Sequence, residues 1–384
     1  MNKLVSVLGF LFAIITLPII SIAQIDNSPS TKTIDSIVNN TLTDNDIPGI
    51  SLGMVRDGHI YYFKGYGSKN IETGEPIDSF TNFLTCSISK LFTATAIMQL
   101  VEQGKINISD KLTKYIPEFS LKGEDYKYIT IRQMLTHTSG LPNIGNKHFI
   151  HPENDSLALS TFAHKLSKKK LSFKPGVQLN AKTYSNTAYD ILGLVIERVT
   201  HQTYSQYVTN HVLLPAHMDS SSFYYQQINT YRRSSPHKKN WLTRHIRVSN
   251  YYPDIPQDKP CGNLNSNAYD LCLWMIQNLA IYNKPSQQNG LLKPATLANM
   301  WTKQETIPGY NTSIGLGWWI VESKKLGPYV FHVGNDPGYS ATLIIVPKNN
   351  FGLVLLCNAE YPKEINWNKL AINLLDYCLL GVNK

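Results

Sequence analysis

Short apolar runs bounded by turn residues stand near both ends of the chain, and such runs predict β-strands. Residues 49–67 form two of these runs around Asp57-Gly58, a dipeptide typical of two-residue hairpin turns. Near the other end, three further runs predict strands at 329–332, 341–346 and 352–356. Strands are therefore expected at both ends of the chain and not in its middle.

The middle of the chain has the apolar spacing of helices, separated by long polar loops. One helix is expected over 89–103, ending at Gly104. Six more candidates lie at 131–135, 157–166, 188–200, 203–208, 268–280 and 294–301. Two helices near the chain ends, at 31–43 and 367–380, complete the pattern.

These elements together predict an α+β fold. Strands from both chain ends form one antiparallel sheet flanked by the terminal helices, and a mainly helical domain is inserted between them. The expected boundaries place the sheet subdomain at about 30–85 and 310–384, and the helical subdomain at about 86–309. The sequence shows neither regular strand–helix alternation nor an internal repeat.

The first 23 residues have the features of a secretory signal peptide. Lys3 precedes an apolar run over 4–20, and small residues follow it up to Ala23. We therefore expect cleavage after Ala23, a mature protein of residues 24–384, and a secreted or periplasmic location. The alternative is an uncleaved N-terminal membrane anchor, because the run is nearly long enough to span a bilayer. Pro18 and the Ser-x-Ala ending favour cleavage.

Composition describes a large folded protein, because 42% of the 384 residues are hydrophobic and only 16% are charged. The net charge is +9, and basic residues concentrate at 165–170 and 232–247. No nucleic-acid recognition motif accompanies them, so they predict a solvated face and no nucleic-acid partner. A basic surface also favours peripheral association with anionic polymers of a cell envelope.

Cysteine and histidine usage argues against a disulfide framework and against a metal site. The five cysteines are odd in number and scattered along the chain. The eleven histidines show none of the spacings that are typical of metal ligands, so no metal is expected.

The tetrapeptide Ser87-Ile88-Ser89-Lys90 is the strongest candidate for chemistry. A serine three residues before a lysine at the start of a helix places both side chains on one helix face. The lysine amine can then take the serine proton, provided that burial or a cationic neighbour lowers its pKa. The helix N-terminus adds backbone N–H groups and a positive partial charge where an oxyanion could form.

Further polar clusters follow this tetrapeptide along the chain. Tyr184-Ser185-Asn186 precedes a predicted helix, and His332-Val333-Gly334 lies on a predicted strand before a turn that begins at Asn335. Together with the stretches 130–142, 262–266 and 315–318, these motifs resemble the serine β-lactamase and DD-peptidase superfamily, most closely its class C-like branch. The resemblance runs from about residue 47 to about residue 356.

The resemblance implies a β-lactamase/transpeptidase-like fold and a role for each matching residue. Ser87 would attack a carbonyl and form an acyl-enzyme, while Lys90 and Tyr184 share proton transfer. Asn186 would hydrogen-bond the substrate or orient Lys90, and the backbone N–H groups of Ser87 and Asn335 would form the oxyanion hole. Water would then release the acyl group, and the resemblance implies no cofactor.

The sequence departs from the family pattern at His332-Val333-Gly334, where lysine-threonine-glycine or a close variant is usual. A lysine is a permanent cation that suits a substrate carboxylate, whereas histidine is mostly neutral at pH 7. Val333 also lacks the hydroxyl that could bind that carboxylate. The departure weakens the case for penicillin hydrolysis and favours an esterase or peptidase. For these residues a purely structural role stays open as an alternative to a role in the site: His332 as a residue of the strand, and Ser185 or Asn186 as the N-cap of the helix that follows.

The leading hypothesis is a secreted serine hydrolase that cleaves an ester or amide bond in a small-molecule or peptide substrate. The alternatives are a penicillin-binding DD-peptidase with weak β-lactamase activity, or a non-catalytic penicillin-binding sensor. A third hypothesis, an α/β-hydrolase, rests on Gly49-Ile50-Ser51-Leu52-Gly53. That motif requires a strand, a sharp turn and then a helix, whereas more strand is predicted after Ser51. The sequence does not determine the oligomeric state.

Overall fold

The computed structural model describes residues 29–144, 155–180, 182–240, 245–283, 290–360 and 367–381. The predicted signal peptide, with its cleavage point at Ala23, lies outside these residues. Within the described ranges, no helix is both long and apolar enough to cross a membrane.

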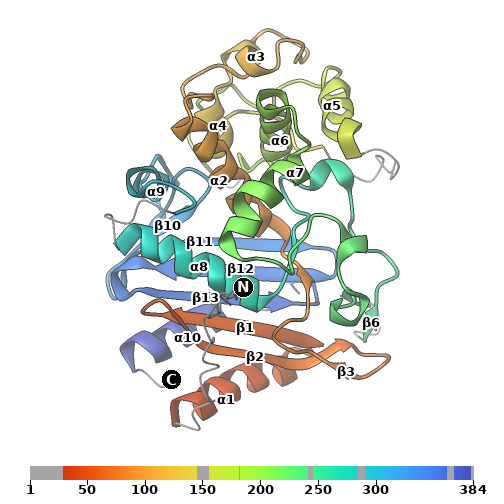
Figure 1. The fold of residues 1–384 in the computed structure, drawn as a ribbon, viewed down its shortest axis with the longest axis vertical. Helices are drawn as coiled ribbons and strands as arrows, with labels where there is room; N and C mark the ends of the chain where they lie inside the picture. The colour runs from red at the N-terminus through yellow and green to blue at the C-terminus, as the bar shows by residue number, and fades with distance from the viewer. Residues whose placement is uncertain are drawn as a thin grey trace, which may run out of the picture.

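A nine-stranded antiparallel sheet forms the centre of the molecule (Figure 1), as the α+β prediction requires. Its strand order is β3-β2-β1-β13-β12-β11-β10-β9-β8. The strands are β1 (Gly49–Arg56), β2 (His59–Asn70), β3 (Glu75–Pro76), β8 (Glu305–Thr306), β9 (Thr312–Ile314), β10 (Trp319–Ser323), β11 (Gly327–Asp336), β12 (Tyr339–Val346) and β13 (Phe351–Cys357). The two chain ends meet in this sheet because β1 pairs with β13.

The predicted hairpin turn joins β1 to β2. Asp57 and Gly58 both have positive φ, at 52° and 81°, which is the backbone of the tight turn that matches strand twist. The two central strands β12 and β13 are buried along their whole length, since helices cover both faces of the sheet. This double coverage explains why they appear in the sequence as continuous apolar runs.

Three helices cover the sheet. The terminal helices α1 (Pro29–Asp44) and α10 (Trp367–Leu380) pack on one face with a hydrophobic cluster of their own. Helix α8 (Ala268–Asn283) lies across the opposite face, against β1 and β13 (Figure 1). The larger hydrophobic cluster lies on the α8 side and continues into the helical part.

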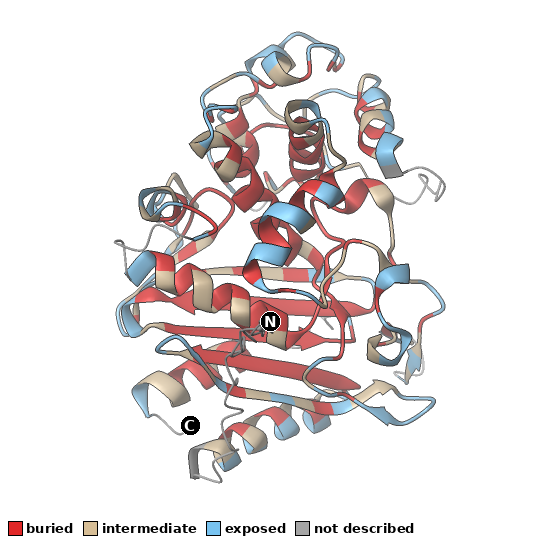
Figure 2. Ribbon diagram, in the orientation of Figure 1, coloured by how far each residue is buried: buried red, intermediate tan, exposed pale blue. Residues whose placement is uncertain are grey.

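The remaining helices gather beyond one edge of the sheet, with α2 (Ser89–Glu102) between them and the strands (Figure 1). They are α3 (Leu112–Tyr115), α4 (Ile131–Leu135), α5 (Asp155–Leu166), α6 (Asn186–Thr200), α7 (Tyr204–Val208) and α9 (Pro294–Met300). Figure 2 shows that α2 is buried on nearly every side, so it is a central helix and not a surface one.

The sequence patterns missed β3, β8, β9 and β10, and they placed the start of β11 two residues too late. They also missed two short strand pairs: β4 (Phe83–Leu84) with β7 (Asn265–Ser266), and, inside the region expected to be helical, β5 (His237–Lys239) with β6 (Ile246–Val248). Strands of two or three residues hold too few side chains to show a period. The partners β4 and β7 are also far apart in sequence, so no local turn signal marks that pair.

Candidate active site

Ser87 lies in the short 3-10 helix η1 (Cys86–Ile88), which runs directly into α2. Its neighbours from Thr81 to Leu91 are all buried, and Ser87 alone among them is partly exposed. Cys86 before it has a φ of 51°, in the left-handed region that a cysteine rarely adopts. This strained turn presents the Ser87 hydroxyl at the surface of an otherwise closed core.

Lys90 lies one helical turn further on and points back at Ser87. Its Nζ donates to Ser87 Oγ at 3.0 Å and to the Cys261 carbonyl at 2.7 Å, although the residue has no exposed surface. Burial acts to lower the pKa of this amine, but Tyr184, Cys261 and Asp190 outweigh burial and raise it. Lys90 is therefore an ammonium at neutral pH that donates to Ser87 Oγ and the Cys261 carbonyl, and the lowered pKa that would let it take the serine proton is not found.

Tyr184 reaches the same point from the residues that precede α6. The Lys90 ammonium lies 5.0 Å from the centre of its ring, and the His137 ring packs against it at 4.3 Å between centroids. The Tyr184 carbonyl accepts a hydrogen bond from Asn143 Nδ2 at 2.7 Å. Tyr184, far from Ser87 and Lys90 in the sequence, thus joins them in one cluster.

Asn186 is the first residue of α6, and Ser185 is the N-cap, because the Ser185 hydroxyl accepts from the Ala188 N–H at 3.1 Å. Of the two residues considered as the N-cap, it is therefore Ser185 that caps α6, and the Asn186 side chain takes no part in capping. The Asn186 N–H donates to Asn143 Oδ1 at 2.8 Å, whereas the buried Asn186 Oδ1 has no hydrogen-bond partner among the described residues. Asn143, which the sequence motifs did not single out, therefore fixes both Tyr184 and Asn186.

His137 contacts both Tyr184 and Ser185. It has a φ of 57°, and its Nδ1 accepts from the Ser185 N–H at 3.1 Å, so the neutral ring carries its proton on Nε2. Burial lowers the pKa of His137 well below its usual range, and the nearby Lys90 cation and His332 lower it further. A neutral ring that holds Ser185 and packs on Tyr184 has a structural role in the cluster.

The end of β11 runs directly beside Ser87. Strand β10 begins at Trp319, which pairs with Phe331, and its other residues pair with earlier residues of β11. The five residues of β11 that follow Phe331 are therefore not covered by β10. At Gly334 the approach is so close that an added Cβ would lie 2.8 Å from the Ser87 nitrogen and 2.7 Å from the Thr85 carbonyl oxygen. Glycine is therefore required at this position by the separation of the two backbones.

Asn335 follows Gly334 and pairs in register with Ser340 on β12, whose hydroxyl donates to Asn335 Oδ1 at 3.1 Å. The side chain is exposed and thus lies on the solvent side of the strand. Its backbone belongs to the uncovered part of β11 that borders Ser87. This position agrees with the oxyanion role that the resemblance implied for Asn335, which stays a prediction.

His332 is 1% exposed, so it does not offer an open binding group. Its Nδ1–H donates to the Val333 carbonyl at 2.8 Å, which leaves Nε2 as a buried acceptor with no partner among the described residues. Burial and the Lys90 cation lower the pKa of His332 to about 3. The ring is neutral at physiological pH, and it supplies no positive charge at the position where relatives have lysine.

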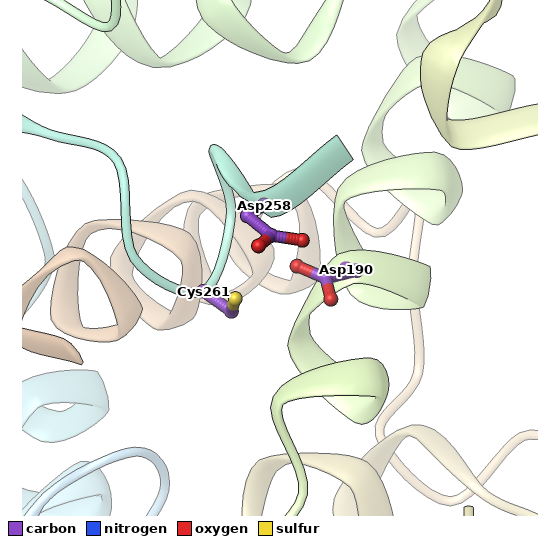
Figure 3. A group of neighbouring side chains, drawn as sticks. All are labelled: Asp190, Asp258 and Cys261. Carbon is purple, nitrogen blue, oxygen red and sulfur yellow. The ribbon is translucent and has the colours of Figure 1, made fainter. Parts of the chain in front are cut away.

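One group of side chains within the described ranges has the composition and spacing to hold a metal ion. Asp190, Asp258 and Cys261 are all buried, and their candidate ligand atoms lie within 4.8 Å of one another (Figure 3). No sequence motif marked this group, because its members come from α6 and from a loop about 70 residues later. All five cysteines of the chain are free thiols, as expected from their spacing.

The fold and the site define a serine hydrolase or a penicillin-binding relative of one. Residues 34–375 match the family described as Beta-lactamase, and the chain belongs to that family. Among curated proteins, it is 31% identical over 345 residues to "Protein flp" of Staphylococcus aureus, covering 88% of this chain and 65% of that protein. It is 26% identical over 336 residues to "Penicillin-binding protein 4*" of Bacillus subtilis, covering 84% of this chain and 70% of that protein. This chain therefore spans about two thirds of the length of these relatives.

Solved structures agree with the fold. "A class C beta-lactamase" matches with a TM-score of 0.76 at 19% identity, covering 94% of this chain and 99% of that one. The D-alanine carboxypeptidase AmpC from Burkholderia cenocepacia matches with a TM-score of 0.72 at 20% identity, covering 90% and 98%. At these identities the matches confirm the β-lactamase/transpeptidase-like architecture and leave the reaction open.

Proposed function

We propose that the protein is a secreted serine hydrolase that cleaves an ester or amide bond through an acyl-enzyme on Ser87. The observation that carries this proposal is the 3.0 Å contact between Lys90 Nζ and Ser87 Oγ, beside the Tyr184 ring. The Lys90 ammonium holds Ser87 Oγ through this hydrogen bond, and the neighbouring Tyr184 side chain supplies the proton acceptor that a serine nucleophile needs.

In the proposed reaction, the Lys90–Tyr184 pair takes the proton of Ser87 while Ser87 Oγ attacks the substrate carbonyl carbon. The backbone N–H groups of Ser87 and Asn335 hold the oxyanion of the tetrahedral intermediate. The pair then returns the proton to the leaving group, and a water molecule hydrolyses the acyl-enzyme by the same route.

The neutral His332 supports an uncharged recognition site and not a carboxylate site. Penicillins, and peptides with a free C-terminal carboxylate, carry a negative charge that a lysine at this position would stabilise. Buried and unprotonated, His332 offers no such charge, and Val333 offers no hydroxyl. We therefore favour esters and amides without a carboxylate next to the scissile bond.

A penicillin-binding peptidase is the second candidate, because one relative is named a penicillin-binding protein and one structural neighbour a D-alanine carboxypeptidase. Turnover of three substrate types separates the two: p-nitrophenyl esters, D-alanyl p-nitroanilides and a chromogenic cephalosporin. We expect hydrolysis of the esters to be fastest and to vanish in Ser87→Ala.

The matched control for that variant is Ser51→Ala. Ser51 is a buried residue of β1 that pairs with Leu356 and Gly65, so the strand expected after it is confirmed and the elbow of an α/β-hydrolase is absent there. Removing its hydroxyl should leave ester hydrolysis unchanged. Full activity in Ser87→Ala, or loss of activity in a folded Ser51→Ala, would refute the proposal.

A further inference from the structure

Asp336 places a carboxylate next to the residue that supplies the proposed oxyanion N–H. It is the last residue of β11, in the part of the strand that β10 does not cover. Side chains alternate along a strand, so Asp336 projects to the same side as Gly334, whose backbone lies against Ser87. At about 3.3 Å per residue, the Asp336 side chain begins roughly 7 Å along the strand from Gly334. The proposed reaction does not use this carboxylate.

The protein compensates the charge of Asp336 only weakly. The residue is partly exposed, and it forms no ion pair with any residue that the structure describes. The Cys86 thiol lies beside it, but a thiol is a weak donor. Burial raises the pKa of Asp336 to about 6, and the Lys90 cation opposes this rise, so the group is ionised at neutral pH. The hydrogen bonds of Lys90 Nζ go to Ser87 and Cys261 instead.

A small space lies in front of the carboxylate, next to Gly262. Gly262 is buried, yet a Cβ added to it would meet only two atoms of the described residues within 4 Å, apart from its neighbours in the chain. They are Asp336 Oδ2 at 3.5 Å and the Asp258 carbonyl oxygen at 3.8 Å. Both atoms are hydrogen-bond acceptors, and one belongs to a charged group. A small cation that donates hydrogen bonds has the chemistry to fill this space.

Tyrosine side chains surround this end of the β11–β12 hairpin. Tyr339 pairs in register with Asp336, and the Tyr252 ring meets the Tyr339 ring edge-on, with 5.7 Å between centroids. Burial raises the pKa of Tyr251, and the carboxylates of Asp258 and Asp336 raise it further, so Tyr251 also lies near Asp336. Aromatic faces attract cations electrostatically. These rings therefore add to the selection for positive charge.

A negative charge at this position opposes the proposed reaction unless a cation accompanies it. The oxyanion forms at the Asn335 N–H, one residue from Asp336, and like charges at such a separation repel each other. A substrate cation held by Asp336 would remove that repulsion during acylation. The same charge repels a substrate carboxylate, in agreement with the absence of a positive charge on the neutral His332.

We propose that Asp336 binds a positively charged group of the substrate, an ammonium or alkylammonium only a few bonds from the scissile carbonyl. This inference rests on the proposed function and names its substrate class, which is cationic esters and amides. A different role for Asp336 would be that of a distant counter-charge for Lys90. Loss of a counter-charge would change the hydrolysis of charged and neutral substrates equally, whereas loss of a cation site changes their ratio.

The test compares charged esters with neutral esters of the same shape. Butyrylcholine and 3,3-dimethylbutyl butyrate differ in charge on the alcohol side, and the p-nitrophenyl esters of β-alanine and butyrate differ in charge on the acyl side. Each kcat/KM is divided by the rate of uncatalysed hydrolysis, which removes intrinsic differences in reactivity. We expect the wild-type protein to prefer the charged ester of at least one pair by about 10- to 100-fold, and Asp336→Asn to lose that preference.

Two further variants locate the effect. Glu360→Gln is the matched control, because Glu360 is exposed and acts on Asp336 through its charge, so the preference should stay within about twofold of wild type. Gly262→Ala places a methyl group in the space and leaves the charge of Asp336 intact. Gly262 does not have a positive φ, so its backbone accepts alanine. This variant should also lower the preference for the charged ester.

The outcomes separate this inference from the proposed function on which it rests. Equal treatment of the charged and neutral members of both pairs by the wild-type protein would overturn the inference, whether or not any variant folds. So would a preference that survives in Asp336→Asn or in Gly262→Ala, or an equal loss for both members of a pair, as expected of a counter-charge for Lys90. Fluorophosphonate titration counts the active sites in each variant. A wild-type protein that is not acylated on Ser87 would instead refute the proposed function.

Discussion

Replacing Gly334 with alanine tests whether the separation between β11 and Ser87 controls activity. The added Cβ would lie 2.7 Å from the Thr85 oxygen and 2.8 Å from the Ser87 nitrogen, and ordinary contact begins at about 3.4 Å. The nearest atom of all is Cys86 Cβ, at 2.6 Å, and it is attached directly to the backbone, so the strand and the residues around Ser87 must separate by roughly 0.6–0.8 Å to reach ordinary contact. Catalytic groups need to be held within about 0.5 Å of their productive geometry.

This displacement acts on the oxyanion site, since the Ser87 and Asn335 N–H groups lie on the two segments that separate. Loss of one oxyanion donor costs about 10²–10³ in kcat, and a partial displacement should cost roughly 10- to 100-fold. Overpacking should also lower the free energy of unfolding by about 1–3 kcal/mol. The assay is kcat/KM for a p-nitrophenyl ester, with active sites titrated by fluorophosphonate so that unfolded protein is not counted.

Gly53→Ala is the matched control. Gly53 lies on β1 of the same sheet, where an added Cβ would meet Cys272 Sγ at 2.5 Å and the Ala268 carbonyl oxygen at 3.1 Å, far from Ser87 in the fold. We expect a comparable loss of stability and unchanged kcat/KM per titrated site. Equal kcat/KM in the two variants would refute the reasoning, because activity would then follow general stability and not the Ser87–β11 separation.

The remaining predictions concern charge at the site. Tyr184→Phe should slow Ser87 acylation by about 10²–10⁴, as expected for loss of a general base, measured by fluorophosphonate labelling; an unchanged rate would assign the proton to Lys90 alone. His332→Lys should increase the rate of penicillin acylation relative to that of a neutral ester, and an unchanged ratio would exclude this position from carboxylate recognition. The folded-state pKa of His332, about 3, lies below its unfolded value, so its contribution to stability is present above about pH 6.5 and is lost as the pH falls toward 3, at about 1.4 kcal/mol per pH unit. For Asp190 the pKa is raised, so its contribution is present below about pH 4 and is lost with the same slope as the pH rises. We measure the free energy of unfolding by urea between pH 4 and 7. Its increase with pH should be smaller in His332→Gln, and its decrease with pH should be smaller in Asp190→Asn.

The sequence predicted the parts of this molecule that depend on short-range spacing. The hairpin at Asp57-Gly58 was predicted because two residues with positive φ are a local requirement. The contact of Ser87 with Lys90 was predicted because residues three apart share a helix face. The α+β sheet from both chain ends was predicted from where the apolar runs stand, without any knowledge of their pairing.

What the sequence patterns missed is created by tertiary contacts. The Cys261 carbonyl that holds Lys90 is a backbone atom, and every residue has one, so no residue type marks it. Asn143 acts through bonds to two residues about 40 positions away. Asp190 is a single polar position in the apolar run of α6, and only the packing of the 3-10 helix η7 (Pro256–Asp258) on α6 brings its carboxyl close to that of Asp258.

The most direct test of the central claim is mass spectrometry of the protein after reaction with a fluorophosphonate and, separately, with a penicillin, with each adduct mapped to its residue. The account predicts a fluorophosphonate adduct on Ser87 and no persistent penicillin adduct. A lasting penicillin adduct on Ser87 would contradict the neutral recognition site and favour a penicillin-binding peptidase or sensor. An adduct on another residue, or none, would contradict the assignment of Ser87 as the nucleophile.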